Sequence, residues 1–330
     1  MTENKIAVVN SSSFGQIFKE HWEELEKIGQ VDRFMVDPEI SGKDLAAKLN
    51  GYNIIIASVT PNFTEEFFDN MDGLQLISRH GIGYNSVDIK AAKEHGVKVT
   101  IVPPLVERNA VAEAALTNLM ALVRQAPAAA EREREGHYAD RAHFMGHEFS
   151  GKQFGVIGCG NIGGRVAELF HFFGGDVLIT DPHPATSDEW WAKNTWAKRV
   201  PLDELLAKCD YISLNASLDD DDYHMIDAEA LKKTKKGVYF VNHARGALID
   251  EQAMMDAVKS GQVAGYAADA MEVEPVPGDH PFLHDDHFLI TPHTSAYTYE
   301  CLHGMGEKCV SDVKNLVSGK PLVRELTSQL

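Results

Sequence analysis

Residues Gly151–Pro182 read GKQFGVIGCGNIGGRVAELFHFFGGDVLITDP and carry the strongest structural signal in the chain. The apolar run Phe154–Ile157 is typical of a parallel strand that is covered on both faces. Gly158, Gly160 and Gly163 then form a G-x-G-x-x-G turn, whose glycines permit a tight turn, close approach of a pyrophosphate and close helix–strand packing. Apolar residues at helical spacing follow, so we expect a helix whose N-terminus faces the phosphates. Together these signals predict a Rossmann-type dinucleotide-binding unit.

The acid at the end of the second strand, Asp181, determines the expected coenzyme. It lies 18 residues beyond Gly163 (181 − 163), close to the position where an acid hydrogen-bonds a ribose hydroxyl. A carboxylate there repels a ribose 2′-phosphate, and the following Pro182, His183 and Pro184 add no Arg or Lys. The sequence therefore predicts NAD as the cofactor rather than NADP.

The composition excludes several classes of partner. The chain has 330 residues and a formal net charge of −18, so nucleic acid and anionic membranes would be repelled. No apolar run approaches the ~20 residues of a membrane span. The N-terminal MTENKIAVVN shows no signal segment, and we expect no regulatory extension beyond Leu330. We therefore expect a cytoplasmic protein that acts on a small molecule and has no nucleic-acid or membrane partner.

The cysteine and histidine spacing predicts no metal site. Neither C-x-x-C pairing nor metal-ligand spacing occurs among Cys159, Cys209, Cys301 and Cys309, which we interpret as free thiols. The charged stretch 131–150 contains His137, His143 and His147, but they do not repeat a ligand spacing with acids on one helix face. We interpret this stretch as a solvated connector.

The alternation of strands and helices predicts two doubly wound α/β domains. Strands are expected at 5–9, 54–58, 75–79 and 97–102 in the first, and at 154–157, 177–180, 210–214, 237–241, 264–268 and 288–291 in the second. Pro103-Pro104 breaks the chain before a long apolar helix at Glu107–Arg124, and Tyr299–Val317 is a helix expected to return to the first domain. We therefore predict one domain from 1–103 and 297–330, and a second domain at 104–296 inserted into it, with a cleft between them and hinges near 103 and 296.

Three polar residues follow predicted strands of the second domain. Arg245 comes just after one strand, Glu274 lies in a loop after the next, and His293 follows the last. Each is a weak signal alone, but open α/β sheets bind ligands at the edge where these strands end. Their convergence beside a nicotinamide predicts an active site. In the first domain, the glycine-containing loop Arg79–Asn85 could present backbone N–H groups to an anion.

These motifs support a resemblance over nearly the whole chain. They are GCGNIG at 158–163, HARGALID at 243–250, the Asp269–Pro275 run, TPHTSAYT at 291–298, RHGIGYNSVD at 79–88 and AVAEAAL at 110–116. With them the chain resembles the D-isomer-specific 2-hydroxyacid dehydrogenase family. The resemblance implies a flavodoxin-like substrate domain built from both termini, a Rossmann-type coenzyme domain in the middle, and a homodimer formed largely through the coenzyme domains.

The resemblance also implies roles for individual residues. Arg245 would fork onto the carboxylate and carbonyl of a 2-keto acid, His293 would donate a proton to the carbonyl oxygen, and Glu274 would hold the imidazole and favour its protonated form. The backbone N–H groups of Ile82 and Gly83 would bind the substrate carboxylate. Coenzyme binding is assigned to Gly158, Gly160, Asn161, Ile162, Gly163, Asp181, Asn215, Ala244 and Asp269, the last facing the nicotinamide carboxamide.

The choice of substrate is the least specified part of the resemblance. Asn215-Ala216-Ser217 replaces the His-x-Pro usual in the family, and His243 stands where a small residue is common. The run Tyr223–Asp227 is similar to the D-lactate dehydrogenase branch, whereas Arg79-His80-Gly81 is also common in phosphoglycerate dehydrogenases. We predict reduction of pyruvate or a slightly larger aliphatic keto acid. The alternatives are 3-phosphoglycerate or hydroxypyruvate/glyoxylate chemistry and, more distantly, a non-catalytic dinucleotide-sensing protein.

Overall fold

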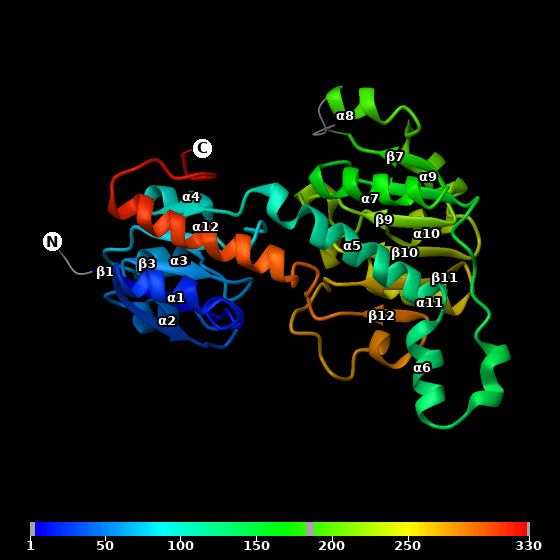
Figure 1. Cartoon of the computed structure of the whole chain (residues 1–330), viewed down its shortest axis with the longest axis horizontal. Coiled ribbons are helices and arrows are strands. Elements are labelled where there is room, and N and C mark those ends of the chain that lie inside the picture. The colour runs from blue at the N-terminus through cyan, green and yellow to red at the C-terminus, as the bar shows by residue number, and fades with distance from the viewer. Residues whose placement is uncertain (1–3, 183–187, 329–330) are drawn as a thin grey trace. The chain divides into compact units, whose positions relative to one another are not determined.

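The computed structural model describes residues 4–182 and 188–328. The chain forms two compact units, one made of Met1–Glu107 with Tyr297–Leu330 and the other of Arg108–Ala296 (Figure 1). Helix α5, Pro104–Val123, contains the point at which the chain passes from the first unit to the second. Across the described residues, no helix combines the length and apolar character needed to cross a membrane.

In the part of the chain that the structure describes, the first unit contains a five-stranded parallel sheet in the order β2-β1-β3-β4-β5. The strands are β1 Asn4–Val9, β2 Gly29–Phe34, β3 Ile54–Ala57, β4 Leu76–Arg79 and β5 Lys98–Thr100. The helices are α1 Lys19–Glu26, α2 Gly42–Leu49, α3 Glu65–Asp69, α4 Ile89–Glu94 and α12 Tyr299–Val317. This strand order is flavodoxin-like, as the sequence predicted.

Both faces of the first sheet are buried, because alternate residues of a strand point to opposite sides. Ile6 and Val8 of β1 pack in a cluster with α1 and α12, whereas Ala7 and Val9 pack with α2, α3 and α4. Figure 1 shows α1 and α12 side by side on one face of this sheet. The buried carboxylate of Asp312 in α12 accepts hydrogen bonds from the hydroxyls of Ser78 in β4 and Thr100 in β5. The C-terminal helix is thereby fixed to the N-terminal sheet.

Within residues 108–182 and 188–296, the second unit contains a seven-stranded parallel sheet in the order β12-β11-β10-β9-β6-β7-β8. The strands are β6 Gln153–Ile157, β7 Asp176–Thr180, β8 Lys198–Arg199, β9 Tyr211–Leu214, β10 Val238–Asn242, β11 Val263–Ala268 and β12 Phe288–Ile290. The helices after α5 are α6 Ala126–Arg134, α7 Asn161–Phe172, α8 Asp188–Lys193, α9 Leu202–Lys208, α10 Ala228–Lys232 and α11 Glu251–Lys259. The strand order reverses between β6 and β9, and open α/β sheets bind ligands at such a switch point.

The architecture confirms the predicted α/β fold class, but two strands were missed. β2 is an edge strand of sequence GQVDRF, and it lacks the continuous apolar pattern that its neighbour β1 has. β8 has two exposed residues and no apolar signal at all. The stretch interpreted as a connector also contains structure, because α6 extends to Arg134 and a 3₁₀ segment covers Tyr138–His143.

Candidate active site

The predicted glycine turn joins β6 to α7, and its backbone leaves room for a bound group. Gly158 has φ +83°, a left-handed conformation that favours glycine. A Cβ added at Gly163 would lie 1.9 Å from the Gly158 carbonyl oxygen, so this helix packs too closely on the turn for any side chain. An added Cβ at Gly160, directly before α7, would meet no atom within 4 Å. The open space in front of the helix N-terminus suits a phosphate group.

A cavity of about 810 Å³ lies over this turn at the switch point of the sheet. Its lining includes Gly158, Gly160, Asp181 and Asn215, four residues that the sequence assigned to the coenzyme. The Asp181 carboxylate accepts a hydrogen bond of 2.6 Å from the Cys159 N–H and is thereby fixed at the cavity. Such a volume is typical of small-molecule and cofactor sites. The cavity therefore fits part of a dinucleotide.

Two points bear on the prediction that the coenzyme is NAD. His183 and Pro184, two of the residues on which that prediction rests, lie outside the described residues. Arg199 of β8, which the sequence analysis did not consider, also lines the cavity, and its guanidinium lies over the ring of Trp191 at 4.7 Å. Asn161 and Ile162, the other residues assigned from the motif, form the first positions of α7.

Arg245 lies in a loop after β10 that is held from both sides. The buried side chain of Asn242 accepts a hydrogen bond from the Ala244 N–H at 3.0 Å and donates one to the Arg245 carbonyl at 2.8 Å. A Cβ added at Gly246 would lie 2.0 Å from the backbone carbon of Met271, so only glycine allows this close packing. No sequence motif indicated a role for Asn242 or Gly246, but both position the loop that carries Arg245.

His293 and Glu274 form the central pair of the site. The Nδ1 atom of His293 lies 2.9 Å from Oε2 of Glu274, and the other oxygen of Glu274 accepts a hydrogen bond from the Met271 N–H at 3.0 Å. Burial lowers the pKa of His293, but the hydrogen bond and charge of Glu274 oppose it, with help from Asp269, and the pKa is raised above its usual value. His293 also has φ +54°, an unusual conformation for a residue with a side chain. The geometry therefore favours a protonated imidazole in a defined orientation.

The His293 loop is organised by the buried carboxylate of Asp269. Its Oδ1 atom accepts hydrogen bonds from the Thr291 hydroxyl at 2.5 Å and the Thr294 N–H at 2.9 Å. Its Oδ2 atom accepts from the Ser295 N–H at 2.8 Å and from the Ser295 hydroxyl. Asp269 thus holds the loop on both sides of His293, and its predicted contact with the nicotinamide stays a prediction.

A second histidine, His243, extends this network to helix α5. Its Nδ1 atom lies 2.7 Å from the Ser295 hydroxyl, and its Nε2 atom lies 3.2 Å from the side-chain nitrogen of Asn118. Burial lowers the pKa of His243 to about 4, so the ring is neutral near pH 7. A neutral ring that accepts at Nε2 and donates at Nδ1 fits both neighbours. His243, which stands where a small residue is common in the family, therefore helps to hold the His293 loop through Ser295.

The predicted substrate-binding residues Ile82 and Gly83 belong to the first unit, whereas Arg245, Glu274 and His293 belong to the second. The Ile82 N–H, which is predicted to bind the substrate carboxylate, donates to Oε1 of the buried Glu107 at 2.7 Å. A substrate carboxylate could use this N–H only by displacing Glu107, whose role the sequence analysis missed.

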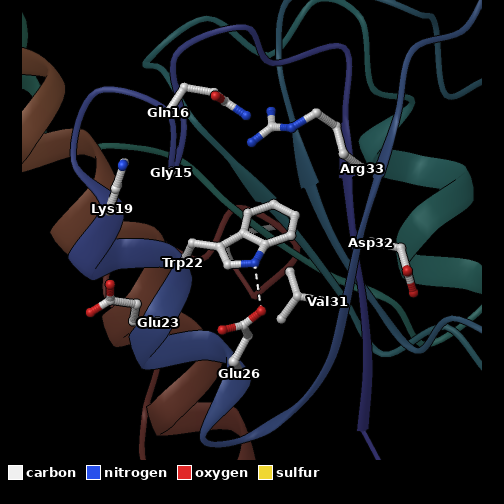
Figure 2. Close-up of a pocket in the computed structure, with 9 residues that line it drawn as sticks. All are labelled: Gly15, Gln16, Lys19, Trp22, Glu23, Glu26, Val31, Asp32 and Arg33. Carbon is white, nitrogen blue, oxygen red and sulfur yellow. Dashed lines mark hydrogen bonds between the residues drawn. The ribbon is translucent and has the colours of Figure 1, made fainter.

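A second cavity, of about 540 Å³, lies in the first unit between α1 and β2 (Figure 2). Two cations, Lys19 and Arg33, line it. Arg33 donates to the backbone carbonyls of Ser11 and Phe14 and lies 5.0 Å from the centre of the Trp22 ring. Three carboxylates, those of Glu23, Glu26 and Asp32, line the same groove. None of the residues predicted to bind coenzyme or substrate lies here, and the surplus of acids does not suit an anion.

Comparisons with known proteins agree with the geometry of the second unit. The family described as "D-isomer specific 2-hydroxyacid dehydrogenase, NAD binding domain" matches residues 116–295, more than half of the chain. The matched range contains the glycine turn, Asp181 and the three predicted catalytic residues.

Similar proteins carry several different names. A glyoxylate reductase of Korarchaeum cryptofilum is 29% identical over 299 residues, which cover 90% of this chain and 88% of that protein. A D-3-phosphoglycerate dehydrogenase of Mycobacterium tuberculosis is 35% identical over 291 residues, which cover 88% of this chain but only 54% of that longer protein. The apo-structure of D-lactate dehydrogenase from Escherichia coli superposes with a TM-score of 0.83 at 29% identity, covering 98% of this chain and 99% of that one.

Proposed function

Because this chain belongs to the D-isomer specific 2-hydroxyacid dehydrogenase family, we propose that it reduces pyruvate or a slightly larger aliphatic 2-keto acid to the D-2-hydroxy acid. It is an NAD-dependent oxidoreductase, and its second unit contains the NAD-binding domain. The open space at Gly160 and the fixed carboxylate of Asp181 fit that coenzyme. The single observation that carries the proposal is the 2.9 Å contact between His293 and Glu274, which favours a protonated imidazole at the edge of the sheet.

The proposed roles follow from the chemistry of each side chain. When bound, NADH supplies a hydride for C2 of the keto acid. Arg245 offers a planar fork that binds the substrate carboxylate and polarises the carbonyl. His293, protonated because of Glu274, donates a proton to the carbonyl oxygen, and in the reverse direction the neutral ring accepts it. Glu274 touches no substrate in this scheme and acts on the pKa and orientation of His293.

Replacing Glu274 with glutamine is expected to move the pH dependence of reduction to lower pH. Reduction needs the protonated ring, so activity falls as pH rises through the raised pKa of His293. An amide lacks the negative charge that raises this pKa, so the fall occurs at lower pH in Glu274→Gln. Above the pKa, each unit of lowering reduces the protonated fraction about tenfold. The measurement is kcat/KM for pyruvate and NADH across pH.

The matched control for this experiment is Glu272→Gln, a change two residues away. Glu272 bonds to Tyr223 and His224 rather than to His293, so this variant should keep the wild-type profile. An unchanged profile in Glu274→Gln would remove Glu274 as the source of the raised pKa.

The preference for an unphosphorylated aliphatic acid rests on three observations. The run Tyr223–Asp227 is similar to the D-lactate dehydrogenase branch, and a D-lactate dehydrogenase is among the superposable structures. A phosphorylated substrate would need a further cation in the first unit. In the groove between α1 and β2, Arg33 is held by backbone carbonyls and Lys19 shares the lining with three carboxylates, which favours the unphosphorylated substrate.

The test is NADH oxidation at neutral pH with pyruvate, 2-ketoisocaproate, phenylpyruvate, glyoxylate, hydroxypyruvate and 3-phosphohydroxypyruvate. The proposal expects the highest kcat/KM for pyruvate or 2-ketoisocaproate. Preference for the phosphorylated acid would favour the phosphoglycerate alternative, and preference for glyoxylate or hydroxypyruvate would favour a glyoxylate reductase. Binding of NADH without turnover of any acid would favour the dinucleotide-sensing alternative.

We further propose that the protein is a cytoplasmic homodimer formed through its NAD-binding domain. Tyr138 and Met145, in the segment after α6, are 64% and 76% exposed, and we assign them to this interface. Gel filtration with light scattering would give the mass of the assembly in solution, and the mass of a monomer would contradict the proposal.

A further inference from the structure

Two helices from opposite ends of the chain bring together a cluster of three possible metal ligands. Glu20 and His21 lie on α1, His303 lies on α12, and one ligand atom from each lies within 4.8 Å of the others. Both helices belong to the first unit and pack on the same face of its sheet (Figure 1). None of the three takes part in the proposed reaction.

His21 is the buried member of the cluster and has an unexplained polar atom. Its side chain is 4% exposed, and among the described residues its Nε2 atom has no hydrogen-bond partner. The ring is fixed against α12, because a Cβ added at Gly306 would lie 2.1 Å from its Nδ1 atom. Buried polar atoms are normally satisfied, so an orphaned imidazole nitrogen in a fixed ring requires an explanation. A bound cation would provide one.

His303 has the surroundings of a metal-binding histidine. Its Nδ1 atom lies 3.5 Å from a carboxylate oxygen of Glu307, one turn along the same helix, and its Nε2 atom lies 3.9 Å from Oε1 of Glu20. Histidine ligands commonly direct one nitrogen to the metal and the other to a carboxylate that fixes the ring. Glu307 occupies the position of that outer carboxylate, and Glu20 that of a second ligand.

The distances are compatible with one ion. Zinc binds histidine nitrogen and carboxylate oxygen at about 2.0–2.2 Å in tetrahedral geometry, so two of its ligand atoms are about 3.4 Å apart. The 3.9 Å between His303 and Glu20 exceeds this separation by about 0.5 Å. The 4.8 Å limit on the other pairs requires a closure of up to about 1.4 Å, which rotation of the exposed Glu20 and the partly exposed His303 side chains can provide.

We infer that Glu20, His21 and His303 bind a divalent transition-metal ion such as Zn²⁺, which cross-links the first helix of the chain to its last long helix. Two imidazoles and one carboxylate favour zinc over magnesium or calcium, which prefer oxygen ligands. The remaining coordination position would hold water. The sequence predicted no metal site because spacing arguments consider neighbouring residues, whereas His21 and His303 are far apart in the chain.

The test is zinc binding by the full-length protein after treatment with EDTA. One equivalent of Zn²⁺ is added, calorimetry gives the stoichiometry and Kd, and elemental analysis after gel filtration gives the zinc retained. We expect one ion per chain in the wild type and a Kd at least about tenfold weaker in both His303→Gln and Glu20→Gln. Neither side chain is buried, so both variants should fold, and zinc should raise the Tm of the wild type more than theirs.

The matched control is His137→Gln, which removes a half-exposed histidine near another acid, Glu135. This variant should keep the wild-type stoichiometry and Kd. The proposal would be overturned by a wild-type protein that retains no zinc, or by His303→Gln and Glu20→Gln proteins that bind it as tightly as the wild type. None of these readouts depends on turnover, so the result is independent of the substrate proposed above.

Discussion

Replacing His293 with alanine is expected to lower kcat for keto-acid reduction by about 10²–10⁴-fold while leaving NADH binding unchanged. The imidazole is the proposed proton donor, and Glu274 keeps it protonated and oriented. Alanine removes the donor but touches neither the glycine turn nor Asp181. Stopped-flow or steady-state kinetics would give kcat, and NADH fluorescence would give the Kd of the coenzyme.

The control for this variant is His287→Ala, which removes an exposed histidine whose nearest carboxylate is Asp285. It should retain wild-type kcat. If His293→Ala turned over pyruvate at the wild-type rate, His293 would not be the acid. If the variant lost NADH binding as well, the change would have disturbed the fold of the loop rather than the chemistry alone.

Replacing Arg245 with lysine is expected to lower kcat/KM for the keto acid by about 10–100-fold, mainly through KM. The guanidinium can form two parallel hydrogen bonds to a carboxylate, whereas an ammonium group is a point charge that cannot reproduce this geometry. The loop itself should keep its shape, because Asn242 and Gly246 hold it through backbone contacts. Initial rates at varied pyruvate would separate KM from kcat.

A conservative change of an exposed arginine, Arg134→Lys, provides the comparison. Arg134 forms an ion pair with Glu131 on the surface of α6, and its replacement should leave both constants unchanged. A KM for Arg245→Lys equal to that of the wild type would show that Arg245 does not bind the substrate through a fork.

The fold could be predicted from the sequence largely because its buried parallel strands are short apolar runs with glycine or acid at their ends. The β6–α7 turn is the clearest case, since glycine is required at Gly163 by a contact of 1.9 Å that any Cβ would make. The edge strands β2 and β8 could not be predicted in the same way. Each has a neighbour on one side only, so its residues need not be apolar.

The positions of site residues could be predicted where those residues directly follow strands. The hydrogen bonds that depend on loop conformation could not. Arg245, Glu274 and His293 follow three neighbouring strands, so their proximity follows from topology. The hydrogen bonds of Asp269 to the His293 loop depend on loop conformation, which a sequence pattern does not encode. The same holds for Glu107, whose carboxylate reaches the Ile82 N–H across 25 residues of sequence.

The chirality of the product tests the proposed reaction most directly. Pyruvate and NADH would be incubated with the wild-type protein and with His293→Ala, and the lactate formed would be separated by chiral chromatography. In the proposed mechanism Arg245 presents one face of the keto acid to the coenzyme, so we expect D-lactate alone from the wild type and almost none from the variant. L-lactate, a racemic mixture, or equal amounts of product from both proteins would contradict it.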